Sequence, residues 1–388
     1  MTTAEQQVRG LLSAAAVRER AHEMLDLAIA GEVGGWRVDL LRLDAAAEIS
    51  ARVTREQYPD LIIPFHARAR HFVAGTPVLP EDPTERGRAA FDLVILSVLL
   101  DAGSGPGWRF VDPVSGGTYA RSEGLAVASQ RMVESGALEG AGAALAALTA
   151  GTLAGGFQVS PDNPLLGLEG RAALLRRLGS RVLERPDIFP GGRLGGLFDL
   201  IATRGSITAP AILELLLEAL GPVWAGRLEL HGVALGDCWR HPAIKRDDAT
   251  DGLVPIHKLS QWLSYSLIEP LQESGVVVTD IDGLTGLAEY RNGGLFMDTG
   301  VLVLADPEDA GRAHDVSSPL IVAWRAMTVA LLDRLAPLVR ERLGVDAASF
   351  PLACMLEGGT WAAGRRLAAE RRDGGGPPLN IISDGTVF

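Results

Sequence analysis

The feature of this sequence that most constrains its fold is the repeated helical spacing of its apolar residues. Segments rich in Ala, Leu, Arg and Glu place apolar side chains three and four positions apart, a pattern typical of amphipathic helices. The segments predicted to be helical are 4–31, 40–56, 85–102, 119–151, 168–184, 208–220, 256–273, 318–343 and 359–372. The sequence therefore predicts a mainly α protein.

Strand character is confined to short, scattered pieces. These pieces are 108–111, 275–278, 300–304 and 379–382. They are too few for a doubly wound parallel sheet. Pro and Gly cluster at 103–113, 160–164, 186–195 and 374–378. We take the third of these clusters as the best candidate boundary, and expect one two-lobed domain over residues 1–388 with approximate lobes 1–200 and 201–388.

Composition limits the class of protein and its partners. The chain has 388 residues, 47% of them hydrophobic, so it can bury a substantial core. A formal net charge of -12 argues against nucleic acid as a partner, because such binding relies on clustered Lys and Arg. Cys238 and Cys354 are widely spaced without a metal-ligand pattern, which favours two buried thiols in a reducing compartment.

The sequence does not have the pattern of a membrane or secreted protein. Its N-terminus lacks the charged-then-apolar order of a secretory signal. Residues 138–157 are small and only weakly apolar, and Glu139 interrupts them. We therefore expect a cytoplasmic protein that does not associate with membranes.

A lysine with a polar strip beside it opens the strongest candidate site. In a helix over 256–273, Lys258, Gln261 and Tyr265 fall at i, i+3 and i+7 and so share one face. The other face is apolar and would serve the core. The strip predicts a buried helix that presents Lys258, Gln261 and Tyr265 to a ligand.

A carboxylate follows 31 residues after that lysine. Asp282 reads as the N-cap of a second helix, with Glu289 near its end and Gly293-Gly294 stopping it. A turn between the two helices would bring Lys258 and Glu289 together, so that each biases the protonation of the other. A helix-to-helix salt bridge without chemistry explains the same spacing.

Tyr290 and Arg291 come directly after the carboxylate. The arginine fork can bind a phosphate or a carboxylate through two parallel hydrogen bonds, although an arginine after a helical glutamate can equally be structural. Both residues are candidate substrate contacts.

A second cluster lies at 66–72, with the sequence HARARHF. His66, Arg68, Arg70 and His71 place two imidazoles and two guanidinium groups within six residues, after an extended segment that ends in proline. This density favours anion recognition or proton transfer, while structural hydrogen bonding is the alternative. A metal site is not expected, because no carboxylate or cysteine lies at ligand spacing beside the histidines.

Two further segments are weaker candidates. The Gly-rich loop 101–110 contains Asp101 and Trp108, and its glycines would let the backbone approach a ligand on which Trp108 stacks. A glycine-rich connector with a core tryptophan is the alternative, and no P-loop or GxGxxG pattern is present. The terminal segment 383–388 could fold back and contribute Asp384.

Taken together, these motifs resemble the uracil-catabolism protein family. The residues that carry the likeness are HARARHF at 66–72, GWRF at 107–110, RSEGL at 121–125, LTGLAEYR at 284–291 and SDGTVF at 383–388. The family was long described as a domain of unknown function. The resemblance implies a place in a pathway that takes uracil through a ribosylated urea to urea.

A more distant likeness concerns the fold and the chemistry. KLSQ at 258–261 followed by LTGLAEYR at 284–291 is similar to the queuosine-salvage nucleotide glycosidases, which have a DNA-glycosylase-like helical fold. In that pattern Lys258 matches the family lysine and Glu289 the active-site aspartate, with a side chain longer by one methylene. The resemblance implies an N-glycosidase with a two-lobed, DNA-glycosylase-like fold.

The implied activity assigns roles to the candidates. Hydrolysis of an N-ribosyl bond passes through an oxocarbenium-like state, which an ionised Glu289 can stabilise while it orients or deprotonates water. Lys258 would keep Glu289 ionised or bind a phosphate, with Arg291 and Arg68 or Arg70 completing anion recognition. The general acid for the leaving nitrogen remains open among His66, His71, Asp101 and Asp298.

We therefore expect an N-glycosidase that acts on a ribosylurea or its 5′-phosphate, a small nucleoside or nucleotide derivative, and that needs no cofactor. Two other classes stay open. One is a metal-dependent amidohydrolase or ring-opening enzyme of pyrimidine breakdown. The other is a non-catalytic ligand-binding or scaffold protein of the pathway.

Overall fold

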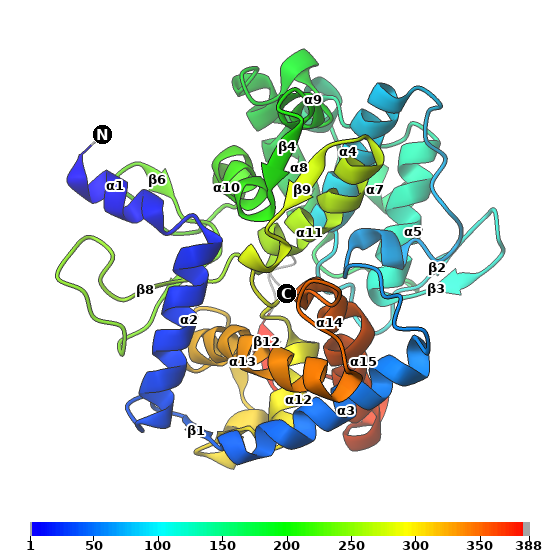
Figure 1. Cartoon of the computed structure of the whole chain (residues 1–388). Coiled ribbons are helices and arrows are strands. Elements are labelled where there is room, and N and C mark those ends of the chain that lie inside the picture. Colours follow the sequence, from blue (N-terminus) through cyan, green and yellow to red (C-terminus); the bar gives the residue numbers. More distant parts are fainter. Residues whose placement is uncertain (1, 383–388) are drawn as a thin grey trace. The chain divides into compact units, whose positions relative to one another are not determined.

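The computed structural model describes residues 2–382 and confirms that the protein is mainly α (Figure 1). Within these residues the strands form six separate pairs, and no sheet has more than two strands. Most helices fall where the apolar spacing predicts them. Examples are α8 (Leu168–Glu184), α10 (Ala209–Leu220), α11 (Lys258–Glu273) and α13 (Pro319–Leu343).

The chain divides into two compact units, each assembled from segments that are distant in sequence. Among the described residues, the first unit contains 2–66, 227–261 and 280–382, and the second contains 67–226 and 262–279. Because the chain passes between the units several times, their boundaries differ from the approximate division near residue 200 that the sequence suggests.

The helices of the first unit are α1 (Thr3–Gly10), α2 (Ala14–Ile29), α3 (Leu43–Gln57), α12 (Tyr290–Asp298), α13, α14 (Leu352–Met355) and α15 (Trp361–Arg371). Helices α2, α3, α12 and α14 pack against α13. Most of the 25 residues of α13 are buried, and this helix runs beside both α2 and α3 (Figure 1). A 25-residue helix buried on most sides serves as the core element against which amphipathic neighbours bury their apolar faces.

The strands of the first unit form short pairs. They are β1 (Trp36–Val38) with β10 (Leu302–Leu304), β5 (Glu229–Leu230) with β6 (Val233–Ala234), β7 (Cys238–Arg240) with β8 (Leu253–Pro255), and β11 (Ala313–Asp315) with β12 (Asn380–Ile382). Only the last of these four pairs is parallel.

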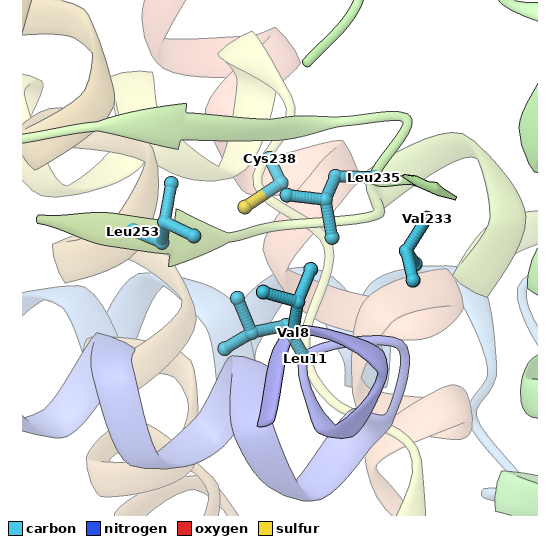
Figure 2. Packing of buried hydrophobic residues seen from close by; sticks show 6 residues of the cluster. All are labelled: Val8, Leu11, Val233, Leu235, Cys238 and Leu253. Carbon is cyan, nitrogen blue, oxygen red and sulfur yellow. The ribbon is translucent and has the colours of Figure 1, made fainter. Parts of the chain in front are cut away.

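A small apolar cluster joins these strands to the N-terminal helix of the same unit. Val8 and Leu11 pack against Val233, Leu235, Cys238 and Leu253 (Figure 2). The sulfur of Cys238 lies within this cluster, and Cys354 is buried as well. Burial in an apolar environment raises the pKa of the Cys238 thiol, which keeps it in the unreactive thiol form.

Seven helices other than α11 are described in the second unit. They are α4 (Pro83–Leu99), α5 (Arg121–Glu134), α6 (Gly142–Ala146), α7 (Ala150–Gly156), α8, α9 (Gly196–Ala202) and α10. Two strand pairs accompany them, β2 (Phe110–Val111) with β3 (Thr118–Tyr119), and the parallel β4 (Ser206–Thr208) with β9 (Val277–Thr279). Helices α6 and α8 approach closely at Gly179, where a Cβ would lie 2.3 Å from the Ala146 nitrogen.

Two segments that were predicted to be single helices are divided into shorter helices. The helix expected over 4–31 is interrupted, because the Ser13 hydroxyl accepts the Ala16 N–H and starts α2 anew. The helix expected over 119–151 is three helices, since α5 ends before Gly136, which adopts a left-handed φ of 73°. Within residues 2–382, no helix combines the length and apolarity needed to cross a membrane.

Candidate active site

Glu289 lies at the start of a helix rather than near the end of one. Residues 284–289 are irregular, and α12 begins at Tyr290 with Glu289 as its N-cap. The two carboxylate oxygens accept the backbone N–H groups of Arg291 and Asn292, each at 2.6 Å. The prediction of a helix that starts at Asp282 and carries Glu289 near its C-terminus is therefore wrong.

The reason for this error lies in the glycine pair. Gly293 and Gly294 do not end the helix but lie inside it, where a Cβ on Gly293 would approach the Trp324 ring to 2.7 Å. On the neighbouring helix α15, a Cβ on Gly364 would lie 2.1 Å from the Arg291 carbonyl oxygen. The glycines thus allow α12 to pack tightly against α13 and α15, and this packing fixes the position of its N-terminus.

The carboxylate of Glu289 is buried, with 8% of the residue exposed. Burial raises the pKa of Glu289, while the Arg291 N–H, the charge of Lys258, the Asn292 N–H and the charge of His66 act in the opposite direction. Lys258 and His66 therefore lie within electrostatic reach of Glu289. We call these three residues, together with Glu357, whose carboxylate contacts the His66 ring, the Glu289 cluster.

Lys258 is the first residue of α11, and Asp237 holds this end of the helix. The Asp237 carboxylate accepts the Lys258 N–H at 3.0 Å, and its backbone carbonyl accepts the N–H groups of Ile256 and His257. His257 adopts a left-handed φ of 49° in this turn. A non-glycine residue in that region is held there by its surroundings, so the start of α11 is tightly defined.

A buried ion pair supports Asp237 in turn. Arg325 donates to both carboxylate oxygens, at 2.7 and 2.8 Å. Burial tends to raise the pKa of Asp237, but the charge and hydrogen bonds of Arg325 and the hydrogen bond from Trp239 outweigh it and hold this pKa below its ordinary range. The carboxylate that anchors Lys258 is therefore ionised.

Gln261 links α11 to the segment before Glu289. Its amide oxygen accepts the Thr285 N–H at 2.8 Å, and its amide nitrogen donates to the Thr285 hydroxyl at 2.5 Å. Gln261 is buried and serves this internal bridge, which is a different role from the substrate contact expected of it. The bridge connects residues that are 24 positions apart and ties Lys258 and Glu289 to one local framework.

A second carboxylate, Glu357, completes the Glu289 cluster. The Nδ1 atom of His66 lies 2.7 Å from a Glu357 carboxylate oxygen, and the Tyr58 hydroxyl donates to the other oxygen at 3.5 Å. Glu357 belongs to a π-helical turn, Leu356–Thr360, between α14 and α15. Sequence reasoning missed Glu357, which lies between apolar residues and a glycine pair (MLEGGT, 355–360).

Arg291 and Tyr290 occupy the first turn of α12. The Arg291 guanidinium donates to the Gly375 carbonyl at 2.8 Å and lies over the Tyr290 ring, 4.7 Å from its centroid. Arg291 is buried and holds the turn Asp373–Gly375, a structural role in place of the expected anion fork. Tyr290 is half-buried.

Asp298 lies at the other end of α12 from Glu289. With about 1.5 Å of rise per residue, a nine-residue helix separates its ends by about 13 Å. Both carboxylate oxygens of Asp298 accept hydrogen bonds from Arg372, each at 2.7 Å. The structure therefore does not bring Asp298 to Glu289, and its ion pair with Arg372 ties α12 to the segment after α15.

The remaining candidates belong to the second unit. Arg68 is fully buried in the 3₁₀ turn Arg68–His71 and donates to the hydroxyls of Ser97 and Ser122, at 2.7 and 3.1 Å. It also pairs with Asp101 at 3.1 Å. We call Arg68, Ser97, Asp101 and Ser122 the Arg68 cluster.

Other residues of this turn are also engaged within the second unit. Arg70 forms an ion pair with Glu269, and the His71 ring packs edge-on against Trp262 with 5.5 Å between the centroids. Tyr265 is completely buried. Arg68, Arg70 and His71 thus all make structural contacts within the second unit.

Trp108 does not offer a face for stacking. It is completely buried, and its indole N–H donates to the Phe157 carbonyl at 3.0 Å. The expectation that Trp108 stacks on a ligand is wrong, since the alternative of a core tryptophan beside a glycine-rich connector describes the structure. Asp384 lies outside the described residues. Within residues 2–382, no group of three or more His, Cys, Asp or Glu side chains has metal-ligand geometry.

Residues 10–388 match the family described as a protein of unknown function, DUF1688, and the chain belongs to this family. The chain is 36% identical over 441 residues to "Uracil catabolism protein 4" of Lachancea kluyveri, with all of both chains covered. It is 38% identical over 406 residues to "Protein urg3" of Schizosaccharomyces pombe, covering 98% of this chain and 99% of the relative. The resemblance to the uracil-catabolism family is thereby confirmed.

Proposed function

We propose that this protein acts in uracil catabolism as an N-glycosidase that hydrolyses the C–N bond of a ribosylurea or of its 5′-phosphate. The place in uracil catabolism is supported by full-length similarity to a relative named for that process. The observation that carries the reaction type is the buried Glu289 carboxylate, fixed by two helix N–H groups and flanked by the charges of Lys258 and His66.

The N-cap position suits the chemistry. Ser, Thr, Asp and Asn are the usual caps, so a buried glutamate in this position is an uncommon choice for stability alone. Its two backbone hydrogen bonds orient the carboxylate, and the positive end of the α12 dipole favours the ionised form. In its ionised form, a carboxylate fixed in this way can stabilise the positive charge that develops on the anomeric carbon and accept a proton from the attacking water.

Lys258 acts on Glu289 through its charge. By lowering the pKa of the buried carboxylate, it increases the fraction of Glu289 that is ionised at neutral pH. Asp237 fixes the backbone of Lys258 at the start of α11, from which the side chain extends. A covalent role for the lysine is not required, because water is the nucleophile in hydrolysis.

The proposal is tested by the identity of the products. Purified protein is incubated with ribosylurea and, separately, with ribosylurea 5′-phosphate across a range of pH, and urea and the free sugar are quantified. We expect equimolar urea and ribose, or ribose 5-phosphate, with the preferred substrate revealing whether a phosphate is recognised. Release of ammonia while the sugar stays attached would indicate amide hydrolysis and overturn the proposal, as would the absence of any product.

A further inference from the structure

His66 and Glu357 form a buried pair within electrostatic reach of Glu289, and the proposed reaction needs an acid for the departing nitrogen. We propose that His66 is the general acid that protonates the departing nitrogen, and that Glu357 is the positioning residue that orients His66. This inference rests on the proposed glycosidase function.

The hydrogen bond between the two side chains defines the imidazole. With Nδ1 at 2.7 Å from the carboxylate, the Nδ1 proton points to Glu357, and any proton that His66 exchanges with a substrate passes through Nε2. Both side chains are largely buried, at 7% and 16% exposure, so the bond is little weakened by water. A histidine oriented by a buried carboxylate is a recurrent arrangement for proton transfer.

Glu357 reaches His66 because of an irregular helical turn. The π-helical turn Leu356–Thr360 packs against α3 through two glycines, where a Cβ on Gly359 would lie 2.9 Å from the Thr54 hydroxyl. A Cβ on Gly358 would approach Ile63 to 3.2 Å, on the segment that leads to His66. Such π turns are rare and are frequent at functional sites.

The backbone and ring of His66 are fixed by other elements of the same unit. Its N–H donates to the Ala353 carbonyl of α14 at 3.1 Å, and its ring lies 6.0 Å from the Trp361 ring of α15. The charge of His66 also acts on Glu289. The first unit therefore places a candidate proton donor and a candidate proton acceptor within electrostatic reach of each other, as hydrolysis of a glycosidic bond requires.

The C–N bond breaks with its electron pair going to nitrogen, which takes the Nε2 proton of His66 and leaves as neutral urea. The water oxygen bonds to the anomeric carbon and gives its proton to Glu289. Glu289 then releases this proton to solvent and His66 takes one up, so the net change is the consumption of one water. The acid is needed because urea leaves poorly as an anion.

Several charged groups face His66. The Glu357 carboxylate contacts both the His66 Nδ1 atom and the Tyr58 hydroxyl, and Glu289 lies within electrostatic reach of His66. The rate should fall on the acidic side as Glu289 gains a proton, because the reaction needs its ionised carboxylate.

The test compares a substrate that needs an acid with one that does not. For His66→Gln we expect kcat/KM on ribosylurea to fall by roughly 100-fold or more, with little change on 4-nitrophenyl riboside, whose leaving group departs unprotonated. Glu357→Gln keeps a hydrogen-bond acceptor but loses the charged group that orients the His66 ring, so it should lower kcat/KM on ribosylurea more than on 4-nitrophenyl riboside, and Glu357→Asp should partly restore it. The matched control is His22→Gln, because His22 pairs with Asp333 at 2.9 Å in the same unit and should leave both rates unchanged.

Other outcomes separate the two proposals. Equal losses on both substrates in His66→Gln would assign His66 a structural role, and unchanged rates would exclude it as the acid. If wild-type protein cleaves neither substrate, the glycosidase proposal fails and the acid role fails with it. Nitrogen-15 NMR of the His66 ring, with Glu357→Ala as comparison, reports the Nδ1–H tautomer independently of activity. A wild-type ring without a proton on Nδ1 would overturn the positioning role of Glu357.

Discussion

The Glu289 cluster and the Arg68 cluster both bury charge, but they compensate it differently. In the Arg68 cluster a fully buried guanidinium is paired with Asp101 and hydrogen-bonded to two serines. In the Glu289 cluster two carboxylates share the region with one lysine and one histidine, and burial leaves the pKa of Glu289 raised. The Arg68 cluster is therefore typical of a structural ion pair. The Glu289 cluster contains groups whose perturbed protonation is typical of a functional site.

This difference shows why burial of charge alone does not identify an active site. Burial lowers the pKa of Arg68, and Asp101 opposes that shift, yet arginine remains charged in proteins under all ordinary conditions. Glu289 and His66 belong to residue types whose protonation can change within the working range of an enzyme. Under the proposed function, the Glu289 cluster therefore carries the chemistry and the Arg68 cluster stabilises the fold.

The largest expected stability effect is in the Arg68 cluster. Arg68→Met removes the cation from Asp101 and should lower the free energy of unfolding by about 3–5 kcal/mol, measured by guanidinium chloride denaturation. The control Arg70→Met breaks the more exposed pair with Glu269 and should cost about 1 kcal/mol or less. A smaller loss of unfolding free energy in Arg68→Met than in Arg70→Met would contradict the structural role of the Arg68 cluster.

Packing around α12 provides the next effect. Gly364→Ala puts a Cβ 2.1 Å from the Arg291 carbonyl, so the helices must separate, and we expect a loss of about 1–3 kcal/mol in unfolding free energy together with lower activity. Gly155→Ala is the matched control, since this helical glycine has nothing within 4 Å of the added Cβ. Equal stability of the two variants would refute the close approach of α12 and α15.

The smallest and most specific effect concerns pH. Lys258→Met removes a charge that lowers the pKa of Glu289, so this pKa should rise further and the acid-side fall in kcat/KM should move to higher pH. The sign follows because Glu289 must be ionised to act, and a higher pKa reduces its ionised fraction at any given pH. Lys245→Met, at an exposed lysine, should leave the profile in place. A shift of the acid side to lower pH in Lys258→Met would contradict the electrostatic role.

Helical spacing was sufficient to predict the fold class, because each long helix depends on its own apolar periodicity. Lys258 lies on a helix, as predicted, and its charge reaches Glu289. The irregular path of 284–289 could not be predicted, since it depends on hydrogen bonds between Gln261 and Thr285, 24 residues apart. Asp282 carries the stronger local cap signal, and this led to the wrong helix start.

The partner of His66 could not be found from the sequence for a related reason. Glu357 is 291 residues away, so no local spacing connects the two side chains. The histidine was singled out by its neighbours Arg68, Arg70 and His71, but these belong to the other unit and are engaged there. A site built from distant segments becomes visible only when the fold brings them together.

The most direct test of the account is the rate of urea release from ribosylurea by Glu289→Gln. A matched control is Asp82→Asn, because Asp82 is also a carboxylate N-cap that accepts two backbone N–H groups, at the start of α4. Both variants should lose no more than about 2 kcal/mol of unfolding free energy. We predict that kcat/KM falls roughly 100- to 10,000-fold in Glu289→Gln and stays near wild type in Asp82→Asn. A folded Glu289→Gln protein that releases urea at the wild-type rate would contradict the central claim.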